Sequence, residues 1–181
     1  MLDLSKGIFI LAIVPFPFPS ITLPGSIPQI LGSILDTDAS SARKTNEWTQ
    51  GDYVLTDDPA RQDFERIHEL MRLSYWANDR PREVMARGMR HSVCLGLLHR
   101  GALVGFARGV TDHATFTWVC DVMIHPDHRG RGLGKWMMRC CLEHPELQTT
   151  SQHLCTRDAH GLYEPFGFKR IEAMRRSSKP L

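Results

Sequence analysis

The segment of residues 122–135 constrains this chain more than any other part of the sequence. It begins as a short apolar strand, turns at Pro126, alternates arginine with glycine, and enters an amphipathic helix. Backbone amides at the start of a helix lack intrahelical partners and favour negative charge, and glycine lets that backbone approach a ligand closely. We therefore expect a pyrophosphate cradle between strand and helix, with basic side chains around it. Its members are Arg129, Gly130, Arg131, Gly132, Leu133, Gly134 and Lys135.

Other interpretations of this segment compete with the first. A glycine-rich turn between a strand and a helix needs no ligand, and an Arg-Gly run can bind nucleic acid, although such runs are usually longer. The phosphate loop of nucleoside triphosphatases fits poorly, because Lys135 lies too close to the glycines and no Ser or Thr follows it. The dinucleotide fingerprint also fits poorly, because its glycine spacing differs and no suitable acidic residue follows.

The segment instead resembles the coenzyme A loop of the GNAT superfamily of N-acetyltransferases. The pattern of that loop is Arg or Gln, two residues, Gly, one residue, then Gly or Ala. Arg129, Gly132 and Gly134 fill that pattern. The family has a second motif, a short helix that ends in Tyr, two variable residues, an apolar residue, Gly and Phe. About thirty residues downstream, this motif is matched by Tyr163, Phe166, Gly167 and Phe168. Ala159 lies where the family has a small residue. One position departs from the family, because Thr156 stands where Asn is common.

This resemblance covers residues 51–174 and implies an α+β, GNAT-like layered fold with a mixed, mostly antiparallel twisted sheet flanked by helices. In that fold the fourth and fifth strands splay apart, and the pantetheine arm of acetyl-coenzyme A pairs with the fourth strand. The matching positions are Val122, Met123 and Ile124, and Thr156 is the further cofactor-binding position. The implied function is transfer of the acetyl group of acetyl-CoA to a primary amine by direct attack in a ternary complex. The alternative is a non-catalytic acyl-CoA sensor.

Two residues are the expected catalytic groups. Tyr163 matches the family tyrosine that protonates the departing sulfur, while a strand amide near Met123 would stabilise the oxyanion. Asp121 is a candidate base, since burial in an apolar run would raise its pKa. The other interpretation is a structural aspartate bonded to Arg108 or to a backbone amide. His125, His160 and bound water are further candidates for the base.

The acceptor site is expected between the first two helices. There Tyr75 and Trp76 could form an aromatic wall, Asp79 could attract an amine and Arg80 could hold a carboxylate. The competing interpretation is that the two aromatic side chains close the core beside a helix end. The acceptor is a small molecule or a peptide, and a homodimer remains open.

Composition limits the classes of partner. Of 181 residues, 22 are Lys or Arg and 20 are Asp or Glu, so electrostatics gives no case for nucleic-acid or membrane binding. Five cysteines, an odd number within apolar runs, indicate a reducing compartment, and we expect a cytoplasmic protein. We expect no metal site, since His125 and His128 have no evident further ligands.

Residues 47–181 are expected to form one domain, preceded by a poorly ordered extension at 1–46 in which prolines interrupt an apolar run too short to span a bilayer. A signal peptide is the alternative for this extension, because Lys6 precedes the apolar run, although Asp3 weakens the positive charge there and no clear cleavage site follows. A helix-start signal occurs at 57–59 and a hairpin turn at Arg100 and Gly101. Apolar spacing predicts helices over 64–73, 81–89 and 133–141 and a short helix at Tyr163. Strands are expected at 53–55, 94–98, 102–110, 115–124, 153–156 and 169–174.

Overall fold

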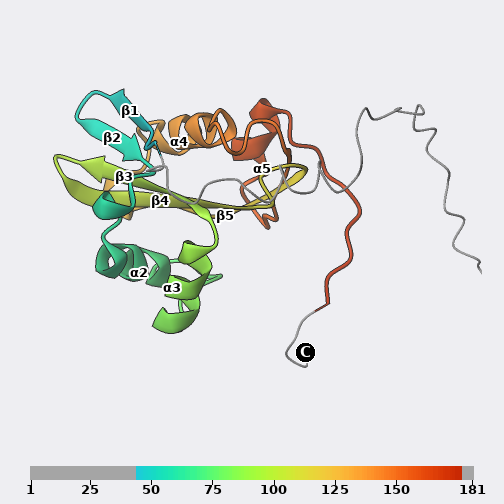
Figure 1. The fold of residues 1–181 in the computed structure, drawn as a ribbon, viewed down its shortest axis with the longest axis horizontal. Coiled ribbons are helices and arrows are strands. Elements are labelled where there is room, and N and C mark those ends of the chain that lie inside the picture. Colours follow the sequence, from blue (N-terminus) through green and yellow to red (C-terminus); the bar gives the residue numbers. More distant parts are fainter. Residues whose placement is uncertain (1–43, 177–181) are drawn as a thin grey trace, which may run out of the picture. The chain divides into compact units, whose positions relative to one another are not determined.

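The computed structural model describes residues 44–176, which are built around a six-stranded sheet (Figure 1). The strands follow one another across the sheet in chain order, and neighbouring strands are antiparallel except β5 and β6, which are parallel. This arrangement confirms the expected fold class. The strands are β1 Glu47–Gln50, β2 Tyr53–Thr56, β3 Val93–His99, β4 Ala102–Thr111, β5 Phe116–Ile124 and β6 Ser151–His153.

Helices cover both faces of the sheet, with α4 on one side and α2 and α3 on the other (Figure 1). The helices are η1 Pro59–Arg61, α2 Phe64–Arg72, α3 Arg82–Arg90, η2 Pro126–His128, α4 Leu133–Leu142, α5 His160–Tyr163 and η3 Glu164–Phe166. The three long helices and the hairpin turn lie where the sequence predicts them. No helix among residues 44–176 combines the length and the apolar character that a bilayer crossing needs.

Each face of the sheet has its own apolar core, and β5 contributes to both. Val119 and Ile124 pack in the cluster that contains α4, whereas Met123 packs with Phe106 against α2 and α3. Residues 119 and 123 should share a face in a regular strand. They do not, because β5 carries a bulge: Ala107 of β4 faces two residues of β5 where the register shifts.

The pairing of β5 with β6 is short. Only residues 116–118 of β5 pair with β6, through Phe116 with Ser151, Thr117 with Gln152 and Trp118 with His153. Within the described residues, the second half of β5 therefore has no strand partner on the β6 side. β5 and β6 correspond to the fourth and fifth strands of the family fold, which are expected to splay apart.

One strand was not predicted, and three predictions about elements are wrong in detail. The additional strand, β1, pairs with β2, and its mostly exposed residues give no apolar alternation in the sequence. The helix-start signal at residues 57–59 begins the short 3-10 helix η1, with Asp58 as its N-cap, and not the long helix α2. The N-cap of α2 is Asp63. β6 ends at His153, where the predicted strand begins, and residues 169–174 form no strand, so they do not close the sheet. The predicted extension at 1–46 lies, except for its last three residues, outside the described residues.

Candidate active site

The loop after β5 enters α4 through two glycines in the left-handed region. Gly130 has φ +74° and Gly132 φ +76°, and a Cβ on either would meet nothing within 4 Å. The backbone conformation therefore favours glycine at both positions, and the space beside each residue is open. Gly132 is also the N-cap of the ten-residue helix α4 and supplies no capping side chain. The first amides of α4 are thus available to an anion.

The two arginines of this loop fix its shape. Arg129 donates from Nε to the carbonyl of Ile124 (2.9 Å), at the end of β5. Arg131 donates to the Tyr53 hydroxyl (3.2 Å) and to the carbonyl of Asp127 (3.3 Å). Both residues therefore act on the loop itself, while Lys135 lies exposed on the first turn of α4.

Tyr53 of β2 anchors the loop from a distance in sequence. Its hydroxyl lies 3.0 Å from Nδ1 of His128, and its ring stacks on His99 with 4.6 Å between ring centroids. Partial burial lowers the pKa of His128, and the charges of His99, Arg131 and His125 lower it further. A neutral His128 can accept a hydrogen bond at Nδ1 from the Tyr53 hydroxyl, while Arg131 donates a hydrogen bond to the oxygen of that hydroxyl. Sequence reasoning missed this contact, because nothing local links Tyr53 to a loop 75 residues later.

Val122, Met123 and Ile124, the expected partners of the pantetheine arm, form the end of β5 that pairs with β4 but has no strand partner on the β6 side within the described residues, and they lead directly into this loop. Met123 and Ile124 are buried and Val122 is half-buried. In the structure, the predicted strand positions form the end of β5, and the predicted loop connects that end, through η2, to the start of α4.

Asp121 lies in the β5 bulge with φ +56° and a nearly fully buried side chain. Its Oδ2 accepts hydrogen bonds from Arg80 Nη1 (2.8 Å) and from Arg108 Nε (2.9 Å). Burial raises the pKa of Asp121, but the hydrogen bond from Arg80 and the charges of Arg108 and Arg80 outweigh it and hold the pKa below its usual range. The expectation that burial would leave this pKa raised is wrong. The structure shows the ion-paired aspartate that the sequence left open as the alternative.

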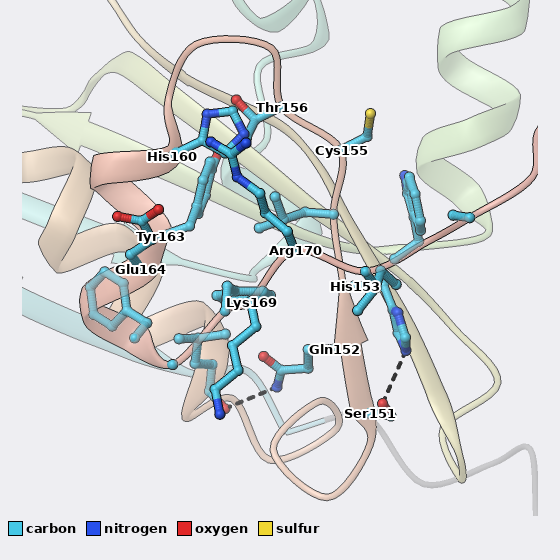
Figure 2. Close-up of a pocket in the computed structure, with 18 of the residues that line it drawn as sticks. Ser151, Gln152, His153, Cys155, Thr156, His160, Tyr163, Glu164, Lys169 and Arg170 are labelled. Atoms are coloured by element: carbon cyan, nitrogen blue, oxygen red, sulfur yellow. Dashed lines mark hydrogen bonds between the residues drawn. The ribbon is translucent and has the colours of Figure 1, made fainter.

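A cavity of about 1050 Å³ opens beside β6 (Figure 2). Tyr163, His160 and Glu164 reach it from α5 and η3, whereas Gln152 and His153 reach it from β6. The residues from β6 were not predicted as site residues, since β6 itself was expected a few positions later.

Tyr163 and Thr156 both line this cavity. Burial raises the pKa of Tyr163 to about 12, with smaller contributions from Cys141, Tyr75 and Asp158, so its hydroxyl is protonated at neutral pH. Thr156 Oγ1 accepts a hydrogen bond from the amide of Ala159 (3.0 Å) just before α5. Thr156 therefore caps this turn, and its hydroxyl proton remains available to a ligand.

The predicted acceptor residues lie at the surface between α2 and α3. Tyr75 and Trp76 are exposed and meet edge to face, with 4.9 Å between ring centroids. The guanidinium of Arg157 lies 4.0 Å from the centre of the Tyr75 ring, which links this surface to the segment before α5. The two aromatic side chains do not close the core. Arg80, the third predicted residue, is bound to Asp121.

Known proteins are similar to this chain in sequence and in fold. The acetyltransferase (GNAT) domain family matches residues 90–170. A Gibberella zeae protein, named for an inferred acetyltransferase activity, is 31% identical over 116 residues, which are 53% of this chain and 66% of that relative. A GNAT-family structure from Xanthomonas campestris pv. campestris, whose acetyltransferase activity is likewise inferred, has 37% identity and a TM-score of 0.66, covering 69% of this chain and 92% of that one.

The fold is also that of an aminoglycoside N-acetyltransferase solved in complex with CoA, at a TM-score of 0.54 and 13% identity over 78% of this chain and 99% of that one. This likeness concerns the fold alone. The sequence relationships above go further, because one of them covers nearly the whole of a GNAT-family structure. The chain belongs to the GNAT family of acetyltransferases.

Proposed function

We propose that this protein transfers the acetyl group of acetyl-CoA to a primary amine by direct attack in a ternary complex. The observation that carries the proposal is the start of α4, which has no side-chain cap and follows two left-handed glycines, just after the half of β5 whose β6 side carries no strand within the described residues. A helix start of this kind suits a pyrophosphate, and an unpaired strand edge suits an extended amide-bearing chain. The fold shared with a CoA-bound N-acetyltransferase supports the same ligand.

Acetyl-CoA supplies an acetyl group on a thioester, and the protein supplies binding and a proton. Amides of residues 130–135 hold the pyrophosphate, and the backbone of Val122, Met123 and Ile124 holds the pantetheine arm. A strand amide near Met123 stabilises negative charge on the carbonyl oxygen. As the amine nitrogen bonds to the carbonyl carbon and the carbon–sulfur bond breaks, the Tyr163 hydroxyl gives its proton to the sulfur.

In this proposal the proton of the attacking amine goes to water, and water returns a proton to Tyr163 after the thiol has formed. Asp121 is held as a carboxylate by two guanidinium groups, and its lowered pKa makes it a weak base. Its role is to position Arg80 and the bulge of β5. The proposal includes a cytoplasmic location, which the five free cysteines support.

An acceptor screen tests the proposal by following free thiol released from acetyl-CoA. We expect thiol release to rise with at least one primary amine in a panel of amino acids, small amines and peptides, with the acetylated amine appearing in equal amount. Cofactor binding without acceptor-dependent release across that panel would contradict the proposal and favour a sensor of acyl-CoA.

A further inference from the structure

A second cavity, of about 480 Å³, lies beside α3 and has a basic lining. Arg80, Arg87, His91 and Arg108 contribute its polar side chains, and the remaining lining is apolar or glycine. Arg80 and Arg108 are the two residues that bind Asp121. Two side chains of the cavity lining therefore connect it to the bulge of β5, which lies immediately before the strand residues that we assign to the cofactor.

Positive charge exceeds negative charge around this cavity. Three guanidinium groups line it, and Asp121, which Arg80 and Arg108 share, is the only carboxylate that binds the lining residues in the described part of the chain. Arg80 donates to Asp121 from Nη1 alone, and its remaining guanidinium nitrogens have no protein acceptor within residues 44–176. Guanidinium groups with spare donors suit a planar oxyanion.

The position of Arg108 is built into the fold. Its Nη1 donates to the carbonyl of Gly88 (3.4 Å) and to the hydroxyl of Ser92 (3.0 Å), and its Nε donates to Asp121. A Cβ at residue 88 would lie 3.2 Å from that Nη1. Glycine is unfavourable inside a helix, and here its lack of a side chain lets the guanidinium lie against the α3 backbone. The cavity thus presents a fixed cation rather than a mobile surface side chain.

We propose that this basic cavity binds a carboxylate of the acceptor, so that the substrate is an amine that also carries an acid group. The inference rests on the proposed function, since it assumes an acceptor amine at the adjoining end of β5. Asp121 already shows that Arg80 and Arg108 together hold a carboxylate oxygen. Amines that carry only positive charge would be repelled by the same lining.

The test uses the full chain, with and without CoA, and matched pairs of probes. The probes are N-acetyl ω-amino acids of increasing chain length, each paired with its primary amide, and binding is measured by calorimetry. We expect the best acid to bind about tenfold or more tightly than its amide, the effect of hydrogen bonds to a charged group. The corresponding free ω-amino acids and their amides are assayed as acceptors in parallel.

Arg87→Gln tests the cavity itself without unpairing Asp121, because Arg87 is exposed and takes no part in that ion pair. We expect it to weaken binding of the acid about two- to fivefold, as for a partly exposed charge, and to leave the amide unchanged. Arg90→Gln is the matched control, since Arg90 lies in the same last turn of α3 but outside the cavity lining.

The possible results separate this inference from the proposed function. Equal binding of acid and amide, binding of neither, or an equal loss in Arg87→Gln and Arg90→Gln would overturn the carboxylate site. If the amides of the ω-amino acids are acetylated as fast as the ω-amino acids themselves, the acetyltransferase proposal stands and the carboxylate site is refuted. Acid-selective binding sensitive to Arg87→Gln, without any acetylation, would support the site and refute the proposed function.

Discussion

Gly132 combines a left-handed backbone with an open surface at the start of α4, and Gly132→Glu tests both properties. The new carboxylate would stand beside amides that we assign to the pyrophosphate, so binding of acetyl-CoA should fall below detection in calorimetry. Strain at a positive φ should also cost about 1–3 kcal/mol of stability. Gly51→Glu is the control, because Gly51 has φ +59° and equally open surroundings in the turn between β1 and β2. Unchanged affinity in a folded Gly132→Glu protein would refute the loop assignment.

Tyr163→Phe removes one hydroxyl and keeps the ring that packs edge to face against Phe168. General acid catalysis typically contributes about 10²–10⁴-fold, so the single-turnover rate should fall within that range while cofactor affinity stays nearly constant. Since the pKa of Tyr163 is raised to about 12, the wild-type rate should show no loss from its deprotonation up to about pH 10. A wild-type single-turnover rate in Tyr163→Phe would remove this residue from the mechanism.

Tyr53→Phe tests the anchor on the cofactor loop. The variant loses the hydroxyl that lies against His128 and Arg131, so the loop should be less well fixed. A hydrogen bond contributes about 0.5–1.5 kcal/mol net, which corresponds to a rise of about two- to thirteenfold in the Kd for acetyl-CoA. We expect kcat to change little. Tyr75→Phe, an exposed tyrosine outside the loop, should leave the Kd unchanged, and an equal rise in both variants would argue against the anchor.

At the level of elements, a buried cluster joins the end of β2 to the end of α4. Asp57 accepts from the amide of Asn46 (2.6 Å) and from its side chain (2.9 Å), and its Oδ2 lies 2.9 Å from Nε2 of His144. Nδ1 of His144 faces the amide of Glu146 (3.1 Å), so the ring proton belongs on Nε2 and the histidine is neutral. Both side chains, Asp57 and His144, are fully buried.

Asp57→Asn should therefore lower the free energy of unfolding at pH 7 by about 1.5–3 kcal/mol, the contribution of hydrogen bonds to a buried charge. Burial raises the pKa of Asp57, but hydrogen bonds from Asn46 and His144 lower it further than burial raises it. The stabilisation is then complete above about pH 4 and is lost as the pH falls through the lowered pKa. Urea unfolding should show the difference between wild type and variant shrinking in acid. Asp52→Asn, at an exposed ion pair, should show neither effect.

Periodic and strongly local features were predictable from the sequence, and long-range ones were not. The stripe of apolar side chains on α4 and the glycine pattern before it depend on neighbouring residues alone, and both lie where expected. The bulge that holds Asp121 has no such signal, because residues 119–124 read as an almost continuous apolar strand. The pairing of Asp121 with Arg80 joins residues 41 positions apart, and it reversed the expected direction of the pKa shift.

At the level of the whole molecule, the sequence assigns residues 1–46 to an extension, whereas Asn46 bonds to Asp57 within the described domain. We expect removal of residues 1–43 to change the Tm by less than about 2 °C, because prolines interrupt the apolar run of that part of the sequence. Removal of residues 1–46 should lower the Tm by several degrees more, through loss of the Asn46 contacts. Calorimetric scans of both shortened chains beside the full chain decide this, and a large loss on removing 1–43 alone would show that the segment packs on the domain.

The brief pairing of β5 with β6 has a consequence for the evolution of this protein. Extending β6 by a few residues along β5 would add backbone hydrogen bonds and make the sheet more stable. The same change would fill the edge on which the proposed ligand depends, so the most stable version of this sheet would be an inactive one. If the proposed function holds, selection for activity opposes completion of this sheet, and we expect stabilising substitutions near residues 151–156 to cost activity.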